Sequence, residues 1–288
     1  MDSMGKPKNR CAGGLLLLVL FVLGLAWPGL PVPAQAGVEE EWARQYDWRM
    51  EDRATALALD SQGNIYVAGS GIGYSTIKYS PDGQQLWDEH YKGLAYGGGM
   101  PRAIATDSDG NVYVTGMSMG PAPDYDYQFA TVKYDTYGSL CWESRYHGPL
   151  RGTNGATDMV VDRRGYVYVT GACAAQKSDS NFYERYSDYA TIKYSLDGRE
   201  LWVRLYNGPA NQDDAASAIA LDHKGYVYVT GTSSGAYATV KYSPGGKELW
   251  VRRCKFAGYD GGAAARGASV TRSGKCNRAY SHGVGQPG

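Results

Sequence analysis

The chain has 288 residues, of which 29 are basic and 29 are acidic, so its formal net charge is zero. A neutral chain lacks the basic surface typical of proteins that bind nucleic acid or anionic lipid, and we expect neither partner. Its 25 tyrosines, 7 tryptophans and 39 glycines favour strands and turns.

The first 36 residues differ from the rest. Basic residues precede an apolar run from Gly13 to Trp27, and Ala34-Gln35-Ala36 offers a small-residue cleavage site. This order is typical of a secretory signal peptide and predicts cleavage after Ala36. The alternative is an uncleaved anchor, although the run is short for a span of about 20 residues. We therefore expect a secreted, periplasmic or cell-surface protein with no membrane span in the mature chain.

Two phrases recur four times in the remainder. The first phrase is LDSQGNIYVAG at 59–69, TDSDGNVYVTG at 106–116, VDRRGYVYVTG at 161–171 and LDHKGYVYVTG at 221–231. The second phrase is YSTIKYSPDGQQLW at 74–87, FATVKYDTYGSLCW at 129–142, YATIKYSLDGRELW at 189–202 and YATVKYSPGGKELW at 237–250. A period of about 40–50 residues with several short strands is typical of propellers and other β arrays.

The first repeat predicts four strands, at 54–60, 64–70, 74–80 and 84–91. Asp60 and Gly63 bound the first turn, and Ser80 and Gly83 bound the third. All eight turns of this kind in the chain have Asp or Ser first and Gly fourth, which is the chemistry of a type I turn followed by a left-handed glycine. Each repeat is therefore predicted to be an antiparallel meander.

Each predicted sheet has apolar side chains on both faces, because Ile65 and Val67 alternate with Tyr66. Such a sheet must be covered on both sides, which stacking around an axis achieves. A β-solenoid is the rival fold, but its coils are usually shorter. We predict an all-β propeller of four-stranded antiparallel blades, with four complete repeats in a ring that is open or incomplete. The expected blades are 54–91, 102–146, 157–206 and 217–254, and the repeated tryptophans are expected to be wedged between them.

The pattern D-x-x-G-[NY]-[VI]-Y-V-[TA]-G, followed by [YF]-[SA]-T-[IV]-K-Y, resembles the SBBP-type β-propeller repeat over residues 54–254. The G-x-x-x-W ending is more weakly similar to quinoprotein propeller repeats. The SBBP resemblance implies a propeller fold and a secreted or cell-surface bacterial or archaeal protein. It implies no catalytic residues.

Both ends of the repeat region are irregular. Trp42 to Tyr46 matches the end of an outer strand, as in Trp87 to Tyr91, so residues 42–46 are predicted to be an orphan outer strand. Residues 255–288 have nearly the length of the three strands that would complete its blade, but they lack the repeat's pattern. We expect a degenerate or disordered tail, arising by decay, truncation or a frameshift; a natural polar tail is the alternative.

In the predicted propeller, the loop between the second and third strands of each blade lies on one face. The links from each blade to the next lie on the same face. Two of these loops, 118–128 and 173–188, are long, and insertions on one face usually mark a binding face. Tyrosines with short polar residues suit contact with a glycan or a protein; solvated loops without a ligand are the alternative. The candidate binding residues are Asp124, Tyr125, Tyr127, Tyr183, Arg185 and Tyr186.

Other polar groups favour structural roles. Asp107-Ser108-Asp109-Gly110-Asn111 resembles a calcium loop but has its Gly at position 4, so a turn is predicted. The repeated Lys78, Lys133, Lys193 and Lys241 are expected to lie on aromatic rings and to pair with blade carboxylates such as the turn aspartate Asp60 or its equivalents. The acidic residues Asp124, Asp126, Asp213 and Asp214 leave a calcium site on the loop face as a weaker alternative. Four cysteines follow residue 36, and their pairing cannot be read: Cys141, Cys173, Cys254 and Cys276.

No catalytic or metal-ligating set can be assembled, because the four histidines recur at no shared position. We therefore expect no cofactor, and a binding or scaffold module for an unknown protein or glycan. Two alternatives stay open: a propeller enzyme, such as a quinoprotein-like oxidoreductase, lyase or hydrolase, and a truncated fragment without independent function.

Overall fold

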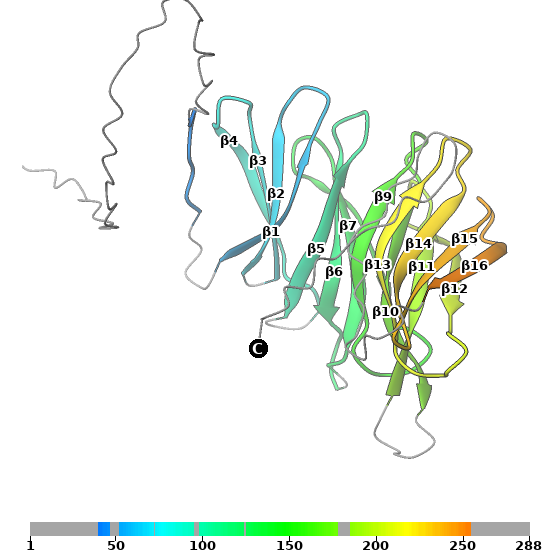
Figure 1. Ribbon diagram of the computed structural model, residues 1–288. Coiled ribbons are helices and arrows are strands. Elements are labelled where there is room, and N and C mark those ends of the chain that lie inside the picture. The colour runs from blue at the N-terminus through cyan, green and yellow to red at the C-terminus, as the bar shows by residue number, and fades with distance from the viewer. Residues whose placement is uncertain are drawn as a thin grey trace, which may run out of the picture. The chain divides into compact units, whose positions relative to one another are not determined.

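The computed structural model describes residues 40–46, 52–71, 73–94, 98–123, 125–177 and 185–254. These residues form sixteen strands in four antiparallel sheets and no helix (Figure 1). In each sheet the four strands lie in chain order, and each pairs with the next. The predicted all-β propeller of four-stranded blades is confirmed.

The strand bounds are as follows. Sheet 1 contains β1 (Arg53–Leu59), β2 (Ile65–Gly71), β3 (Gly73–Tyr79) and β4 (Gln85–Tyr91). Sheet 2 contains β5 (Gly99–Thr106), β6 (Val112–Met119), β7 (Tyr127–Tyr134) and β8 (Leu140–Tyr146). Sheet 3 contains β9 (Gly155–Val161), β10 (Val167–Lys177), β11 (Arg185–Tyr194) and β12 (Glu200–Tyr206). Sheet 4 contains β13 (Asp214–Leu221), β14 (Val227–Ser233), β15 (Ala236–Tyr242) and β16 (Glu248–Cys254).

The first strand of every sheet begins a little before the bound that the sequence predicted. Each of these strands also contains a register shift, seen between Ala54 and Ala56 in β1 and between Pro101 and Ala103 in β5, which interrupts the alternation of side chains. At this irregularity the neighbouring strand approaches closely, and a Cβ on Gly116 would overlap the carbonyl oxygen of Met100. The last residue of the repeated YVYVTG phrase must therefore be glycine, because the first strand of the same sheet leaves no room for a side chain there.

The tight turns form as predicted. In the first turn the amide of Gly63 donates to the carbonyl of Asp60 at 3.1 Å, and Gly63 has φ +80°. The Asp60 carboxylate accepts the amides of Gln62 and Asn64, each at 2.9 Å. The equivalent Asp107 makes the same contacts in the turn that resembled a calcium loop, so the turn interpretation of that segment is confirmed.

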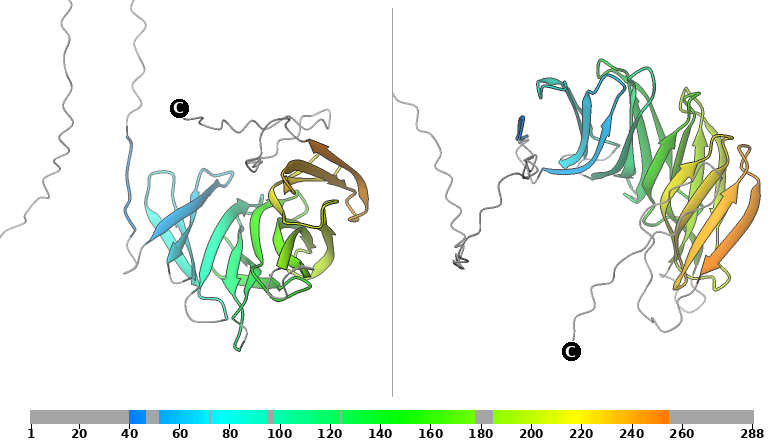
Figure 2. Two further views of the ribbon diagram at one scale, coloured as in Figure 1. Left: turned by 60° about the horizontal axis from the view of Figure 1, so that its bottom comes forward. Right: turned by 45° about the horizontal axis from the view of Figure 1, so that its top comes forward.

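The four sheets pack face to face in chain order (Figure 2). Innermost strand β1 contacts β5, β5 contacts β9, and β9 contacts β13. Within the described ranges, β1 and β13 make no comparable contact. Each junction buries apolar side chains from both sheets; that between sheets 1 and 2 contains Tyr66, Ala68, Tyr74, Val112, Val114 and Val132.

The repeated tryptophans lie at these junctions. Trp142 on β8 has its ring centroid 6.0 Å from that of Tyr113 in its own sheet and 6.3 Å from that of Tyr194 in sheet 3. Its indole N–H donates to the carbonyl of Leu196 at 2.9 Å. Trp87 and Trp202 make the same type of contact with Thr136 and Pro244. The predicted wedge between sheets is therefore confirmed for these three rings.

The repeated lysines lie on aromatic rings, as expected. Lys78 Nζ is 5.1 Å from the centroid of Tyr66, and Lys241 Nζ is 4.9 Å from that of Tyr228. Their expected carboxylate partners do something else: Asp60 Oδ2 accepts the hydroxyl of Tyr66 at 3.1 Å. Among the described residues no ion pair joins these lysines to the turn aspartates. The aspartates fasten each turn to its own blade.

Three of the predicted features lie wholly or partly outside the described residues. The signal peptide 1–36 and the tail 255–288 lie wholly outside them. Of the four cysteines, Cys276 also lies outside, while Cys141, Cys173 and Cys254 are free thiols. Burial, with a smaller contribution from Asp188, raises the pKa of the Cys173 thiol to about 12, so this thiol is not reactive near neutral pH.

Candidate binding face

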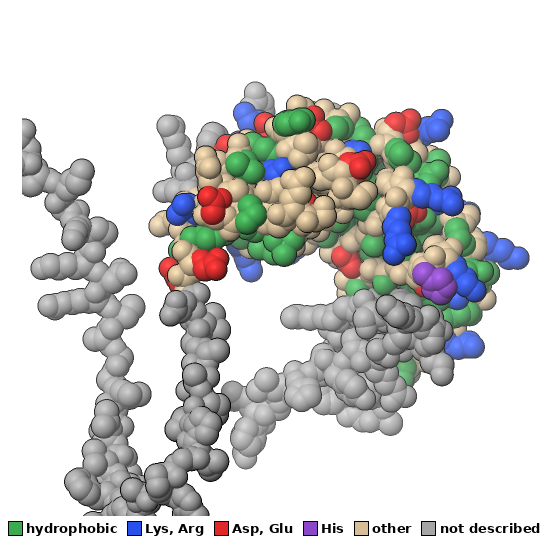
Figure 3. Space-filling view, turned by 90° about the horizontal axis from the view of Figure 1, so that it is seen from above, with side chains coloured by type: hydrophobic (Ala, Val, Ile, Leu, Met, Phe, Trp, Pro, Cys, Tyr) green, Lys and Arg blue, Asp and Glu red, His purple; other side chains and the backbone are tan. Residues whose placement is uncertain are grey.

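The two ends of the sheets differ in character. At one end lie the tight turns, and Figure 3 views the protein from there, with basic and acidic side chains scattered among apolar and neutral ones. At the other end lie the connections between second and third strands, together with the links from each sheet to the next (Figure 1). We call this second end the loop face. The predicted sharing of one face by these two kinds of segment is therefore observed.

Hydrogen bonds tie the link between sheets 2 and 3, residues 147–154, to the hairpins on either side. Asn154 donates its backbone amide at 3.1 Å and its side-chain amide at 3.0 Å to the carbonyl of Tyr127. On the other side, the amide of Ala174 donates to Asn154 Oδ1 at 2.8 Å, and the amide of Leu150 donates to the carbonyl of Ala174 at 3.1 Å. The link therefore bridges β7 and β10.

A hollow of about 390 Å³ lies beside this bridge on the loop face. Its wall combines apolar surface from two prolines, an alanine and a leucine with one acidic, one basic, one amide and one imidazole side chain. The residues are Pro121, Ala122, Asp126, Gln128, His147, Pro149, Leu150 and Arg151. Apolar surface with a few polar groups is the usual composition of a small-ligand or side-chain site.

Arg145 on β8 holds the connection between β6 and β7 in place. Its guanidinium donates to the carbonyls of Ser118 at 3.0 Å and Met119 at 2.8 Å. It also donates to Oε1 of Gln128 at 3.0 Å. Charge-assisted bonds of this kind are stronger than neutral ones, so one wall of the hollow is fixed before any ligand arrives.

The structure places three of the six candidate residues on the loop face with their side chains. Tyr125 is 53% exposed, has φ +48° and donates its amide to the carbonyl of Pro121. Tyr127 is half-buried at the start of β7, and Tyr125 and Tyr127 flank Asp126, which lines the hollow. Tyr186 is half-buried in β11 on the neighbouring sheet.

The other three candidates are less defined. Asp124 and Tyr183 lie outside the described residues, and Arg185 is placed only by its backbone, which pairs with Lys177. One expectation about this region is wrong: 173–188 is not a loop throughout. The ladder of sheet 3 continues from Cys173 opposite Asp188 to Lys177 opposite Arg185, with a register shift between Ala174 and Gln176.

Two of the acidic residues proposed as an alternative calcium site, Asp213 and Asp214, accept hydrogen bonds from the protein itself, and Asp124 lies outside the described residues. Asp213 Oδ1 accepts the amide of Ser187 at 2.9 Å and its hydroxyl at 3.0 Å, which joins the sheet 3 hairpin to the link before β13. Asp214 is fully buried and accepts the amide of Gly208 at 2.5 Å. Across the described ranges no group of three or more His, Cys, Asp or Glu side chains could hold a metal ion.

None of the six candidate residues lines the hollow, although four of its lining residues lie in the predicted loop 118–128, namely Pro121, Ala122, Asp126 and Gln128. The candidate residues came only from the loops between second and third strands, whereas His147, Pro149, Leu150 and Arg151 belong to the link between blades. The available signal was the segment HGPLRGTN at 147–154, which varies between repeats and belongs to the same predicted face.

In the part of the chain that the structure describes, no helix is long and apolar enough to cross a bilayer. No curated protein matches the chain in sequence. Two segments, 96–121 and 201–237, match the family model described as SBBP, beta-propeller repeat.

Solved structures resemble the chain at low identity. A protein from Lactobacillus plantarum is 16% identical, with a TM-score of 0.50, over 77% of this chain and 62% of that one. A protein of unknown function from Bacteroides caccae is 10% identical, with a TM-score of 0.46, over 79% and 70%. BamB from Moraxella catarrhalis is 15% identical, with a TM-score of 0.39, over 68% and 50%. This chain thus spans less than two thirds of the Lactobacillus and Moraxella structures.

The first matched segment covers β5 and β6, and the second runs from β12 through β13 and β14 to the start of β15, so both contain a first and a second strand that the repeats predicted. The chain therefore has a β-propeller fold, and two of its segments, 96–121 and 201–237, match the SBBP repeat.

Proposed function

We propose that the protein is a binding or scaffold module whose ligand contacts lie on the loop face, around the hollow between sheets 2 and 3. The observation that carries the proposal is the hollow itself, about 390 Å³ with Asp126, Gln128, His147 and Arg151 in its wall. The exposed Tyr125 beside it adds a ring that can stack on a sugar or an apolar side chain.

The hollow suits a ligand that projects one polar group into a shallow site. Its acidic, basic and amide side chains can exchange hydrogen bonds with hydroxyl groups, as in a sugar, or with a peptide backbone. We propose an extracellular glycan or protein as the ligand class, in keeping with the secretory signal predicted at 1–36. No catalytic role is proposed for these side chains.

The test is a binding screen of the purified protein against immobilised glycans and extracellular protein fractions, followed by variants of the site. Tyr125→Ala and Asp126→Asn should each weaken binding about tenfold, since hot-spot side chains dominate such contacts. Tyr137→Ala is the matched control, because Tyr137 is 83% exposed but belongs to a tight turn at the opposite end. Equal binding by all three variants would exclude the hollow as the site.

Export is tested separately. The protein recovered from the periplasm, cell surface or medium should begin at Gly37 if the signal is cleaved after Ala36. An exported protein that retains residue 1 would contradict the cleavage.

A further inference from the structure

Residues 42–46 contact sheet 1 in the way that the outer strand of each sheet contacts the next sheet. The indole N–H of Trp42 donates to the carbonyl of Pro81 at 3.1 Å, as that of Trp202 donates to Pro244 at 3.3 Å. Two residues later, Arg44 Nε donates to the carbonyl of Gly83 at 2.9 Å, and Arg204 Nε donates to that of Gly246 at 2.6 Å. Pro81 and Pro244 occupy the same turn position in their repeats.

The end of the segment repeats the pattern. The Tyr46 hydroxyl contacts Asp88 Oδ2 at 3.2 Å and His90 Nε2 at 3.1 Å. One sheet later, the Tyr91 hydroxyl contacts Glu143 Oε1 at 2.5 Å and Arg145 Nη1 at 2.6 Å. The segment therefore holds the position of an outer strand, although within the described ranges no other strand pairs with it (Figure 1).

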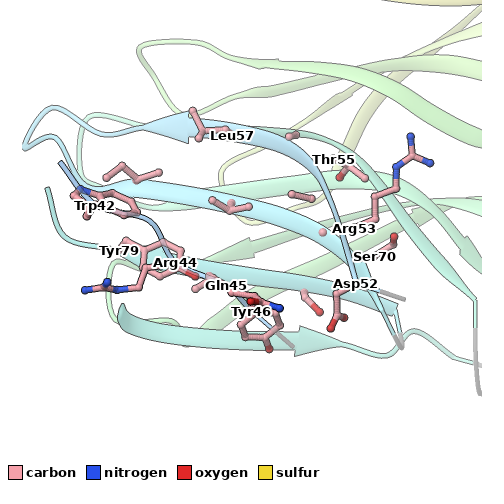
Figure 4. Close-up of a pocket in the computed structure, with 17 residues that line it drawn as sticks. Trp42, Arg44, Gln45, Tyr46, Asp52, Arg53, Thr55, Leu57, Ser70 and Tyr79 are labelled. Carbon is pink, nitrogen blue, oxygen red and sulfur yellow. The ribbon is translucent and has the colours of Figure 1, made fainter. Parts of the chain in front are cut away.

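A groove of about 730 Å³ separates this segment from the inner part of sheet 1 (Figure 4). The outer part of the face is covered, with Ile77 only 5% and Tyr79 only 6% exposed. The inner part is open, with Leu57 63% exposed. At the matching position of sheets 3 and 4, Met159 is 7% and Ile219 is 6% exposed, because a preceding sheet covers them.

The three complete junctions show what fits such a face. In the junction between sheets 1 and 2, Tyr66, Ala68 and Tyr74 from the second and third strands of one sheet cover the valines of the next. An occupant of the groove needs the same tyrosine and small-residue pattern on three strands. It needs no outer strand, because residues 42–46 already hold that position.

Two candidate sources do not fit this description. In the chain's own residues 255–288, KCNRAY replaces the YVYVTG phrase, so Lys, Asn and Arg would stand where Val and Tyr are buried elsewhere. Sheet 4 of a second copy has the right face, but it carries its own outer strand with Trp250, which would compete with Trp42 for one position.

We propose that this groove binds three strands of a second polypeptide built from the same repeat, and that residues 42–46 complete that sheet as its outer strand. The bound sheet would cover Leu57 and the neighbouring apolar side chains of β1 and β2, and its third strand would pair with residues 42–46 as β15 pairs with β16. This interaction surface is separate from the proposed loop-face site.

The direct experiment uses a labelled peptide of residues 214–243, which contains β13–β15 and a tight turn, titrated into the full chain. We expect saturable binding, weakened about tenfold or more by Leu57→Asp and unchanged by Leu140→Asp. Leu140 is the matched control, because it is 53% exposed on another sheet. A longer peptide, residues 214–254, should bind more weakly than the short one, and the order should reverse in the Trp42→Ala/Tyr46→Ala double variant.

A second measurement avoids dependence on the peptide's own solubility. Replacing residues 255–288 by a duplicate of residues 207–243 should raise Tm by several degrees, and Leu57→Asp should abolish the gain while Leu140→Asp leaves it intact. The proposal would be overturned if neither the peptide binding nor the rise in Tm were observed. It would also be overturned if Leu57→Asp changed neither of them. Peptide binding only after removal of 255–288 would assign the groove to the tail, and a self-associated chain dispersed by Leu57→Asp would assign it to a second copy.

Discussion

The indole of Trp142 lies directly against Gly198, so closely that a Cβ on this glycine would be 2.7 Å from the ring. Gly198 belongs to the turn between β11 and β12 and has φ +80°. The same arrangement joins Trp202 to Gly246. These turn glycines therefore serve two purposes: they adopt a left-handed conformation, and they leave room for an aromatic ring from the preceding sheet.

A pair of glycine variants separates the two purposes. Gly225 has φ +77°, but a Cβ there would make only ordinary contacts with the Pro244 side chain, of which the shortest is 3.6 Å to Cγ. Gly225→Ala should therefore lower the free energy of unfolding by about 1 kcal/mol through backbone strain alone. Gly198→Ala should cost about 1–3 kcal/mol more, because the ring must also shift. Urea denaturation measures both, and equal losses would show that the ring does not rest on Gly198.

Alkaline pH should destabilise the protein. Burial, with a hydrogen bond to Asp107, raises the pKa of Tyr113, and burial also raises the pKa of Tyr168 and Tyr194 well above the usual value. Below about pH 10 these phenols are protonated in both states, so their contribution is intact. Above it the unfolded chain ionises first, and stability falls as pH rises.

The measurement for this effect is the urea midpoint against pH, with phenolate absorbance recorded in parallel. The buried tyrosines should titrate together with unfolding. A urea midpoint that stays constant above about pH 10 would contradict the burial of these rings. Complete ionisation of the tyrosines, seen by phenolate absorbance while the protein is still folded, would contradict it as well.

Arg145 should control the order of the loop-face connection between β6 and β7. Arg145→Leu removes its bonds to Ser118, Met119 and Gln128 and should cost about 2 kcal/mol. The sheet itself should persist, because sheet 3 has Leu205 at the matching position. Hydrogen exchange should accelerate at 119–127 and stay unchanged in the turn at 195–198; uniform acceleration would indicate a general rather than a local role.

The fold was predictable from sequence because its determinants are local and repeated. Each tight turn is specified by an aspartate or serine and a glycine, as at Asp60 and Gly63, and each of these residues has its own steric or hydrogen-bonding reason. The tryptophan wedge followed from the need to cover two apolar faces. The register shift in each first strand was not predictable from the repeats. One extra residue interrupts the alternation of side chains, and no residue type in the sequence marks its position.

The candidate site was predictable only in part, because it is built by segments that vary between repeats. The loop face followed from topology, but none of the candidate residues chosen on it lines the hollow. His147 and Arg151 lie in a link that was predicted to share this face, but nothing in the sequence of the link shows that it bonds to β10 and so forms a wall of the hollow. The predicted partner of Asp60 was also wrong. The repeat places both Lys78 and Tyr66 near this carboxylate, and it is the hydroxyl of Tyr66 that donates to it.

The central claim is that each sheet is stabilised by the tryptophan of the sheet before it, and two alanine variants test it most directly. Trp142 packs between Tyr113 and Tyr194 and donates to Leu196, whereas the described ring contact of Trp250 is with Tyr228 of its own sheet. Trp142→Ala should lower the free energy of unfolding by about 3 kcal/mol, and Trp250→Ala by about 1 kcal/mol. Equal losses for the two variants would contradict the account.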